Sequence, residues 1–137
     1  MNFVSVRVIT DDVRRLVEFY EQCLQTTAEW STPDFAELAT RSCTLAIASA
    51  RTMALFDADL ARPADNHSVI IEFRVADVDH DYRRLAHLVD EVVQTPTTMP
   101  WGNRSLLFRD PDGNLVNFFT PVTVAAEERQ QLSLIHI

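Results

Sequence analysis

The residues best placed to do chemistry are an arginine and a glutamate in two similar strand-like runs. Arg7 lies in the run over residues 3–9, and Glu72 lies in the run over residues 68–75. The first run alternates, and its apolar Val4, Val6 and Val8 match Val69, Ile71 and Phe73 of the second, so each charged side chain points away from the apolar face of its strand. A guanidinium and a carboxylate at equivalent positions can form an ion pair or do acid–base work. The alternative is that both are simply solvated.

The composition excludes several kinds of site. The chain has 137 residues and no lysine, so it cannot carry a Schiff-base lysine or the lysine of a P-loop or kinase site. Its two glycines, Gly102 and Gly113, cannot form a glycine-rich phosphate loop. A net charge of −8 gives little reason to expect nucleic-acid binding. No Ser-His-Asp arrangement or pair of inward-facing carboxylates indicates hydrolytic chemistry.

The cysteines and the hydropathy pattern favour a cytoplasmic protein with no membrane association. Cys23 and Cys43 lack the spacing of metal ligands, and we expect both to be reduced and partly buried. No apolar run approaches the roughly 18 residues that cross a bilayer. Arg7 interrupts the N-terminus too early for a signal peptide. A hydrophobic content of 47% is that of an ordinary globular domain.

An internal repeat supplies the elements that position these residues. When Asp12 is aligned with Asp77, the apolar residues of the two strand-like runs coincide. Each aspartate is placed to cap a helical stretch, which extends to about Leu24 in the first half and about Asp90 in the second. The two helices share an apolar stripe at the same spacing, formed by Val13, Val17 and Tyr20 and by Val78, Tyr82 and Leu85.

Three more strand-like runs follow each helix, so the chain has the pattern β-α-β-β-β twice. They cover residues 27–31, 35–40 and 44–48 in the first half and 92–95, 105–109 and 115–120 in the second. The turn Asp110-Pro111-Asp112-Gly113 joins the last two runs, and Asp side chains bond their own backbone in such turns.

This pattern predicts one domain over residues 1–122. Its modules cover residues 1–56 and 67–122, with a connector at 57–66 and a C-terminal extension at 123–137 that has helical potential over 125–132.

Five short motifs follow one another along the chain: Val8-Ile9-Thr10-Asp11-Asp12-Val13, Glu18-Phe19-Tyr20, Val75-Ala76-Asp77-Val78-Asp79, Pro100-Trp101-Gly102-Asn103 and Phe108-Arg109-Asp110-Pro111-Asp112-Gly113-Asn114. In this order and at this spacing, the chain resembles the vicinal oxygen chelate superfamily of glyoxalase I, bleomycin resistance protein and extradiol dioxygenases. The resemblance covers about residues 2–122. It implies an α+β fold in which the two modules form a bent eight-stranded mixed sheet around a cavity.

The resemblance also implies where a metal would be held. Metal-dependent members place a His or similar group on the first strand of each module and a Glu or similar group on the last strand. Here the equivalent positions carry Ser5, Ile70 and Asn117, and the run over residues 44–48 has no acid, imidazole or amide. A hydroxyl, a hydrocarbon and an amide do not supply the charge that a divalent ion needs. We therefore expect no metal and no cofactor, with a site at His67 and Glu72 as the residual alternative.

Strand alternation and the resemblance together predict the cavity lining. If Val4, Val6 and Val8 pack under the first helix, Ser5 and Arg7 point into the cavity. The repeat then places Arg7 opposite Glu72, where metal-dependent members hold their ion. The residues expected to contact a ligand are Ser5, Arg7, Trp30, Phe35, Ile70, Glu72, Trp101, Asn103, Arg104, Phe108, Asn117 and Phe119. The alternative for the phenylalanines is that they fill the core.

An aromatic-rimmed cavity suits a planar organic ligand. The sequence therefore predicts a metal-free protein that sequesters an aromatic or antibiotic-like small molecule, and the resemblance implies a homodimer. One alternative is a glyoxalase-like lyase, isomerase or dioxygenase with an atypical or absent metal site, in which no catalytic residue is identified. Another is a structural member without a ligand.

Overall fold

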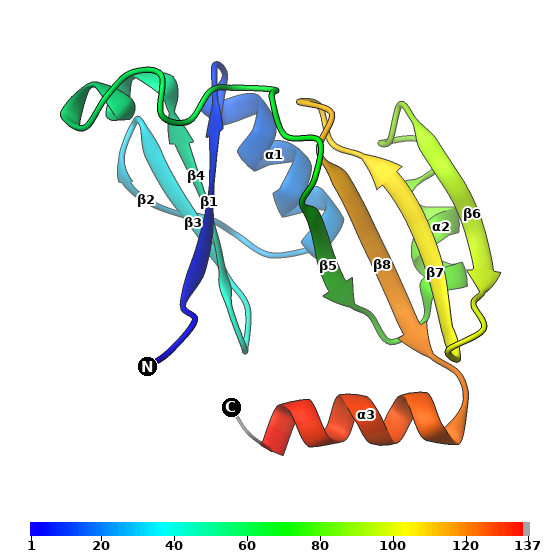
Figure 1. The fold of residues 1–137 in the computed structure, drawn as a ribbon. Coiled ribbons are helices and arrows are strands. Elements are labelled where there is room, and N and C mark those ends of the chain that lie inside the picture. The colour runs from blue at the N-terminus through cyan, green and yellow to red at the C-terminus, as the bar shows by residue number, and fades with distance from the viewer. Residues whose placement is uncertain (136–137) are drawn as a thin grey trace. The chain divides into compact units, whose positions relative to one another are not determined.

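The chain folds as two compact units, Met1–Asn66 and His67–Ile137, in a computed structural model that describes residues 1–135. Each unit contains one β-α-β-β-β module, and each forms its own four-stranded mixed sheet (Figure 1). This arrangement confirms the predicted α+β class and both modules of the repeat. Residues 136 and 137, at the end of the predicted extension, lie outside the described part of the chain.

The first unit has its strands in the order β1-β4-β3-β2, with β1 parallel to β4 and the other neighbours antiparallel. Its elements are β1 (Ser5–Thr10), α1 (Val13–Leu24), β2 (Glu29–Thr32), β3 (Phe35–Ala39), β4 (Thr44–Ser49) and the 3₁₀ helix η1 (Ala50–Leu55). Leu16 and Tyr20 of α1 are fully buried, as are Leu38 of β3 and Ile47 of β4. These side chains form the core between α1 and one face of the sheet.

The second unit repeats this order as β5-β8-β7-β6, again with its first strand parallel to its last. Its elements are β5 (Ile70–Arg74), α2 (Val78–Leu85), β6 (Val92–Thr98), β7 (Asn103–Arg109), β8 (Leu115–Pro121) and α3 (Val124–Ile135). The ring of Phe118 meets those of Phe73 and Phe108 edge-on, with centroids 5.6 and 5.2 Å apart. With Val78 and Leu85 of α2, these rings form the core on the α2 face of the sheet.

The two helices that follow the first strands begin where the sequence predicts. The Asp12 carboxylate accepts a hydrogen bond of 3.1 Å from the Arg15 backbone N–H, and Asp77 accepts one of 3.1 Å from that of His80. Each aspartate thereby satisfies one of the free N–H groups of a helix start. Both predicted caps are confirmed.

The second helix is shorter than predicted. The sequence extends it to about Asp90, but α2 ends at Leu85. The backbone N–H groups of Leu88 and Val89 both bond to the Leu85 carbonyl, so the last turn tightens into a 3₁₀-type turn that closes the helix.

The hairpin between β7 and β8 follows the turn chemistry predicted for it. The buried Asp110 carboxylate accepts hydrogen bonds of 2.9 Å from the backbone N–H groups of Asp112 and Asn114, and one of 2.8 Å from the Asn114 side chain. Gly113 has a φ of +83°, which an L side chain rarely adopts. The turn is therefore held by Asp110 and permitted by Gly113.

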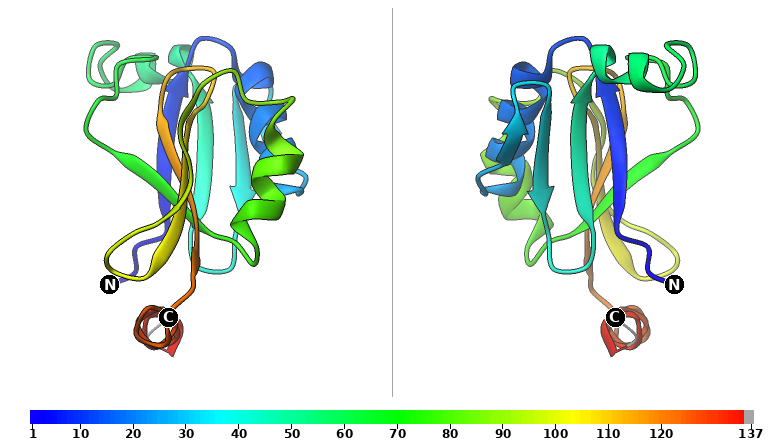
Figure 2. Two further views of the ribbon diagram at one scale, coloured as in Figure 1. Left: turned by 90° about the vertical axis from the view of Figure 1, so that its right-hand side faces the viewer. Right: turned by 90° about the vertical axis from the view of Figure 1, so that its left-hand side faces the viewer.

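The helix α3 leaves the end of β8 sideways instead of lying flat on the sheet, and it is seen end-on in Figure 2. It is attached at its start, where the Thr123 hydroxyl accepts from the Ala126 backbone N–H at 3.2 Å and the Ala126 side chain is fully buried. The Arg129 guanidinium also donates to the carbonyl of Trp101. The predicted helical stretch over residues 125–132 is confirmed. No described helix has the length and apolar character needed to cross a membrane.

The two glycines offer a matched test of how α3 is anchored. An alanine at Gly113 meets no atom within 4 Å, so the cost of Gly113→Ala comes from the left-handed backbone alone, about 1 kcal/mol. At Gly102, also left-handed with a φ of +91°, the new Cβ would collide with the Thr123 hydroxyl and lie 3.1 Å from the Ala126 Cβ. We expect Gly102→Ala to lower the free energy of unfolding in urea by at least about 1 kcal/mol more than Gly113→Ala. Equal losses would contradict this anchoring role.

Candidate functional site

The face of the second sheet opposite α2, called here the open face of the second sheet, carries a mixture of apolar and polar side chains. Strand register places them in three rows: Ile70, Leu115 and Arg109; Glu72, Asn117 and Leu107; and Arg74, Phe119 and Ser105. Residues paired across neighbouring strands lie on the same face of a sheet, so each row is a set of neighbours. The predicted site residues Ile70, Glu72, Asn117 and Phe119 share this face.

The centre of the open face is an amide–carboxylate pair. The Asn117 side-chain N–H donates a hydrogen bond of 2.8 Å to the Glu72 carboxylate. An ionised carboxylate only accepts, so this bond fixes which end of the amide faces Glu72. The other end, the Asn117 carbonyl oxygen, is buried and has no hydrogen-bond partner among the described residues. A buried acceptor without a donor costs about 1–3 kcal/mol.

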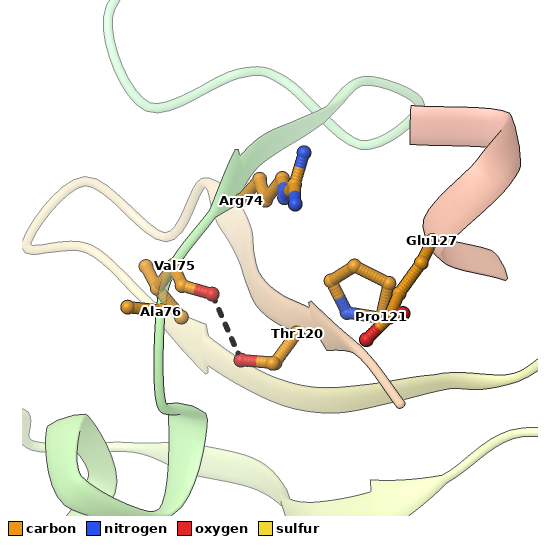
Figure 3. A pocket seen from close by; sticks show the side chains of 6 residues that line it. All are labelled: Arg74, Val75, Ala76, Thr120, Pro121 and Glu127. Atoms are coloured by element: carbon orange, nitrogen blue, oxygen red, sulfur yellow. Dashed lines mark hydrogen bonds between the residues drawn. The ribbon is translucent and has the colours of Figure 1, made fainter. Parts of the chain in front are cut away.

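A pocket of 380 Å³ lies in the same unit, where β5 and β8 end and α3 begins. Its lining is Arg74, Val75, Ala76, Thr120, Pro121 and Glu127 (Figure 3). The Thr120 hydroxyl donates 2.9 Å to the Val75 carbonyl and accepts 3.0 Å from the Val78 backbone N–H. These bonds tie the end of β8 to the turn that leads from β5 into α2. Sequence reasoning missed this pocket, because Glu127 reaches it only through the docking of α3.

Trp101 and Asn103, both predicted to contact a ligand, lie at the α3 end of the second sheet. Trp101 is in the turn before β7, and its side chain is 55% exposed. Asn103 pairs with Pro121 of β8, one of the pocket residues. Its side-chain carbonyl oxygen is a second buried acceptor without a partner in the described part of the chain.

Three of the predicted site residues of the first unit, Ser5, Arg7 and Phe35, lie on the face of the first sheet opposite α1. The Arg7 guanidinium stands over the ring of Phe35, 5.3 Å from its centroid, and reaches it across β4. The side chains of β4 below them are alanines, and Ala46, which pairs with Arg7, is 2% exposed. Ser5 lies on the same face of β1 as Arg7 and is exposed. The predicted Arg7–Glu72 ion pair stays a prediction.

Two residues expected in the cavity lie on the α2 face of the second sheet instead. The Arg104 guanidinium donates to the Asp79 carboxylate of α2 at 2.8 and 3.0 Å. Phe108 is fully buried against Phe118. Because Phe108 pairs with Val116, both belong to the helix side of the sheet. The prediction that Arg104 and Phe108 face the cavity is therefore wrong.

Trp30 is a similar correction in the first unit. Trp30 pairs with Ala36, which in turn pairs with Ile47 of the core beside α1, so Trp30 lies on the α1 face. Phe35 pairs with Ala48 and lies on the opposite face. A register irregularity between Trp30 and Thr32 lets the two aromatics diverge. Trp30 and Phe35 therefore do not line one surface.

The positions implied for a metal carry donors that do not fit a divalent ion. Ser5, Ile70 and Asn117 lie on β1, β5 and β8, and β4 supplies neither acid nor imidazole. Within residues 1–135, no group of three or more His, Cys, Asp and Glu side chains could hold a metal. The side-chain NH₂ group of Asn117, its only side-chain donor, is also hydrogen-bonded to the Glu72 carboxylate. The absence of a metal and of a cofactor stays a prediction, argued from the chemistry of these donors.

Comparison with known proteins identifies the family. Residues 2–118 match the model of the Glyoxalase/Bleomycin resistance protein/Dioxygenase superfamily. The chain belongs to this superfamily. It is 25% identical over 125 residues to the uncharacterized protein YraH of Bacillus subtilis (strain 168), covering 87% of this chain and 98% of that protein.

Solved structures of the superfamily have the same fold. A family enzyme from Burkholderia phytofirmans PsJN matches with a TM-score of 0.78 at 17% identity, over 89% of this chain and 100% of that one. A lactoylglutathione lyase from Agrobacterium tumefaciens matches with a TM-score of 0.68 at 20% identity, over 86% and 92% of the two chains. At these identities the likeness concerns the fold.

The Arg104–Asp79 pair makes a pH-dependent prediction. Its hydrogen bond lowers the pKa of the Asp79 carboxyl below the ordinary value of 3.8, and raises the pKa of Arg104. The stability that this pair adds is present above pH 3.8 and is lost as the pH falls through the lowered pKa. In an NMR titration we expect Asp79 to titrate below 3.8 in the wild type and to move up in Arg104→Gln. The control is Arg109→Gln, because Arg109 bonds Glu91 and not Asp79. This variant should leave the pKa of Asp79 unchanged.

The contact between Arg7 and Phe35 can be measured by a double-mutant cycle. We expect Arg7→Met and Phe35→Leu to show a coupling free energy of about 0.5–1 kcal/mol, because a cation over an aromatic ring contributes that much at an exposed site. The measurement is the free energy of unfolding of the wild type, both single variants and the double variant. Strictly additive losses would show that the contact adds no stability.

Proposed function

We propose that this chain binds a small planar organic molecule on the open face of the second sheet, without a metal, and sequesters it as a homodimer. The observation that carries the proposal is the buried Asn117 carbonyl oxygen, which lacks a donor beside the Glu72 carboxylate. A bound molecule with an N–H or O–H group would supply that donor and recover its cost once the side chains that cover this oxygen move aside. Binding sites commonly combine such an orienting polar group with apolar surface.

The apolar surface is supplied by the residues around this pair. Ile70 is 47% exposed, and Leu107, Leu115 and Phe119 are partly exposed in the neighbouring rows. The ring of Phe119 and these aliphatic side chains offer contact area to a flat ligand. The ligand is therefore expected to pack against Phe119 while its donor group reaches Asn117.

The donor set favours binding over metal-dependent turnover. A lyase, isomerase or dioxygenase of the superfamily type would need anionic or imidazole ligands where this chain has Ser5, Ile70 and Asn117. Asn117 holds an amide where a carboxylate is implied, and that amide is bonded to Glu72. These residues are suited to hydrogen-bond a neutral or cationic organic group.

The homodimer is supported by the strand order. β1 and β5 each stand at one end of the order of their own sheet. Edge strands of this kind present backbone N–H and C=O groups that can pair with a second chain. Sedimentation equilibrium should accordingly give twice the mass of one chain, and a monomer at micromolar concentration would contradict this part of the proposal.

Ligand binding is tested by quenching of tryptophan fluorescence with a panel of planar aromatic compounds. We expect at least one compound that carries an N–H or O–H donor to bind, and Asn117→Leu to weaken it about tenfold, because a buried polar partner is then lost. Arg104→Gln lies on the other face of the same sheet and should bind as the wild type does.

Two outcomes would contradict the proposal. A panel without any quenching would remove the support for a ligand on this face. Purified protein with stoichiometric nickel, zinc, iron or manganese, together with consumption of the bound compound, would show that the chain is an enzyme of the superfamily. Elemental analysis tests for the metal before any assay is run.

A further inference from the structure

The pocket at the end of β5 and β8 brings together two opposite charges that nothing else in the described chain neutralises. Arg74 enters it from the last position of β5, and Glu127 enters it from the first turns of α3 (Figure 3). Neither side chain forms a hydrogen bond or an ion pair with any group that the structure describes, although both line one pocket of 380 Å³. The two side chains do not bond each other, and both border the volume that one small molecule could occupy.

Other parts of the second unit hold the two charged residues at the pocket. Glu127 is held because α3 is anchored beside it by the buried Ala126 and by the bond from Arg129 to the Trp101 carbonyl. Arg74 is held in the ladder between β5 and β8, opposite Phe119. The polar groups between them, the Thr120 hydroxyl and the Val75 carbonyl, already bond each other. The polar groups left for a ligand are the guanidinium and the carboxylate.

We propose that this pocket binds a small zwitterion of the amino acid class, with its carboxylate on Arg74 and its ammonium group on Glu127. A guanidinium can hold a carboxylate through two parallel N–H donors, and an ammonium group donates to a carboxylate through a charge-assisted bond. A zwitterion satisfies both protein charges at once. It also carries no net charge, so the charge of −8 on this chain does not repel it as it repels a simple anion.

This site adjoins the one proposed for a planar ligand, because Arg74 pairs with Phe119, but the two proposals use different contacts. It uses a residue of β5 and a residue of α3 at the end of the sheet, whereas the planar ligand is assigned to Asn117 and Phe119 on its open face. Either site can exist without the other. A planar panel that fails to quench tryptophan fluorescence would leave the zwitterion proposal standing. Failure of every amino acid to bind would likewise leave the planar-ligand proposal standing.

The test is calorimetric titration of the full chain with linear amino acids of increasing charge separation: glycine, β-alanine, γ-aminobutyrate and 6-aminohexanoate. We expect one of them to bind at least about tenfold more tightly than acetate or methylammonium, because only a zwitterion meets both charges. Its length reports the distance between Arg74 and Glu127. The binding should weaken as salt is added, since both protein charges are exposed to solvent.

Two variants separate the roles of the charges. Arg74→Gln should reduce binding of the best amino acid about tenfold and leave methylammonium binding unchanged. Glu127→Gln should reduce it by a similar factor and leave acetate binding unchanged. Glu128→Gln, the next residue along α3, and Arg41→Gln, an exposed arginine of the first unit, are controls that should bind as the wild type does.

The proposal is overturned if none of the amino acids binds more tightly than acetate and methylammonium. It is also overturned if Glu128→Gln weakens binding as much as Glu127→Gln, because the effect would then come from the general charge of α3. Circular dichroism of each variant confirms that it is folded, so a loss of binding reports the pocket itself.

Discussion

Alternate residues of a strand point to opposite faces, and this constraint decides which side chains of the chain can act together. On β8 it sends Val116 and Phe118 to the α2 core and leaves Asn117 and Phe119 on the open face. On β5 it places Glu72 on the same face as Asn117, so the carboxylate and the amide can bond. A shift of one residue in β5 would turn Glu72 toward α2, and a shift in β8 would turn Asn117 toward it, so either shift would separate the pair.

Much of the fold follows from local signals in the sequence. Asp12 and Asp77 mark both helix starts because an aspartate in this place satisfies a free backbone N–H. Asp110 and Gly113 mark the last hairpin for similar local reasons. The helix end at Leu85 was harder to predict, because the tight turn that closes α2 leaves no glycine or proline as a signal.

Only part of the site could be predicted from the sequence. The wrong predictions concern residues whose direction is set by how the strands pair. Once the hairpin sets Arg109 opposite Leu115, Phe108 must face the helix, so its placement in the cavity could have been avoided. Trp30 is different, because an irregularity in the strand register turns its side chain away from Phe35. No sequence signal predicts that irregularity. The Glu127 contribution to the pocket also needed the three-dimensional docking of α3.

The attachment of α3 has a consequence for the energetics of the second unit. The structure attaches the helix near its start, through the buried Ala126 and a few hydrogen bonds. A molecule that joins Arg74 to Glu127 would connect this helix to the sheet by a second attachment. By mass action, a bound ligand and the docked position of the helix would then favour each other, and the amide protons of α3 would exchange more slowly as occupancy rises.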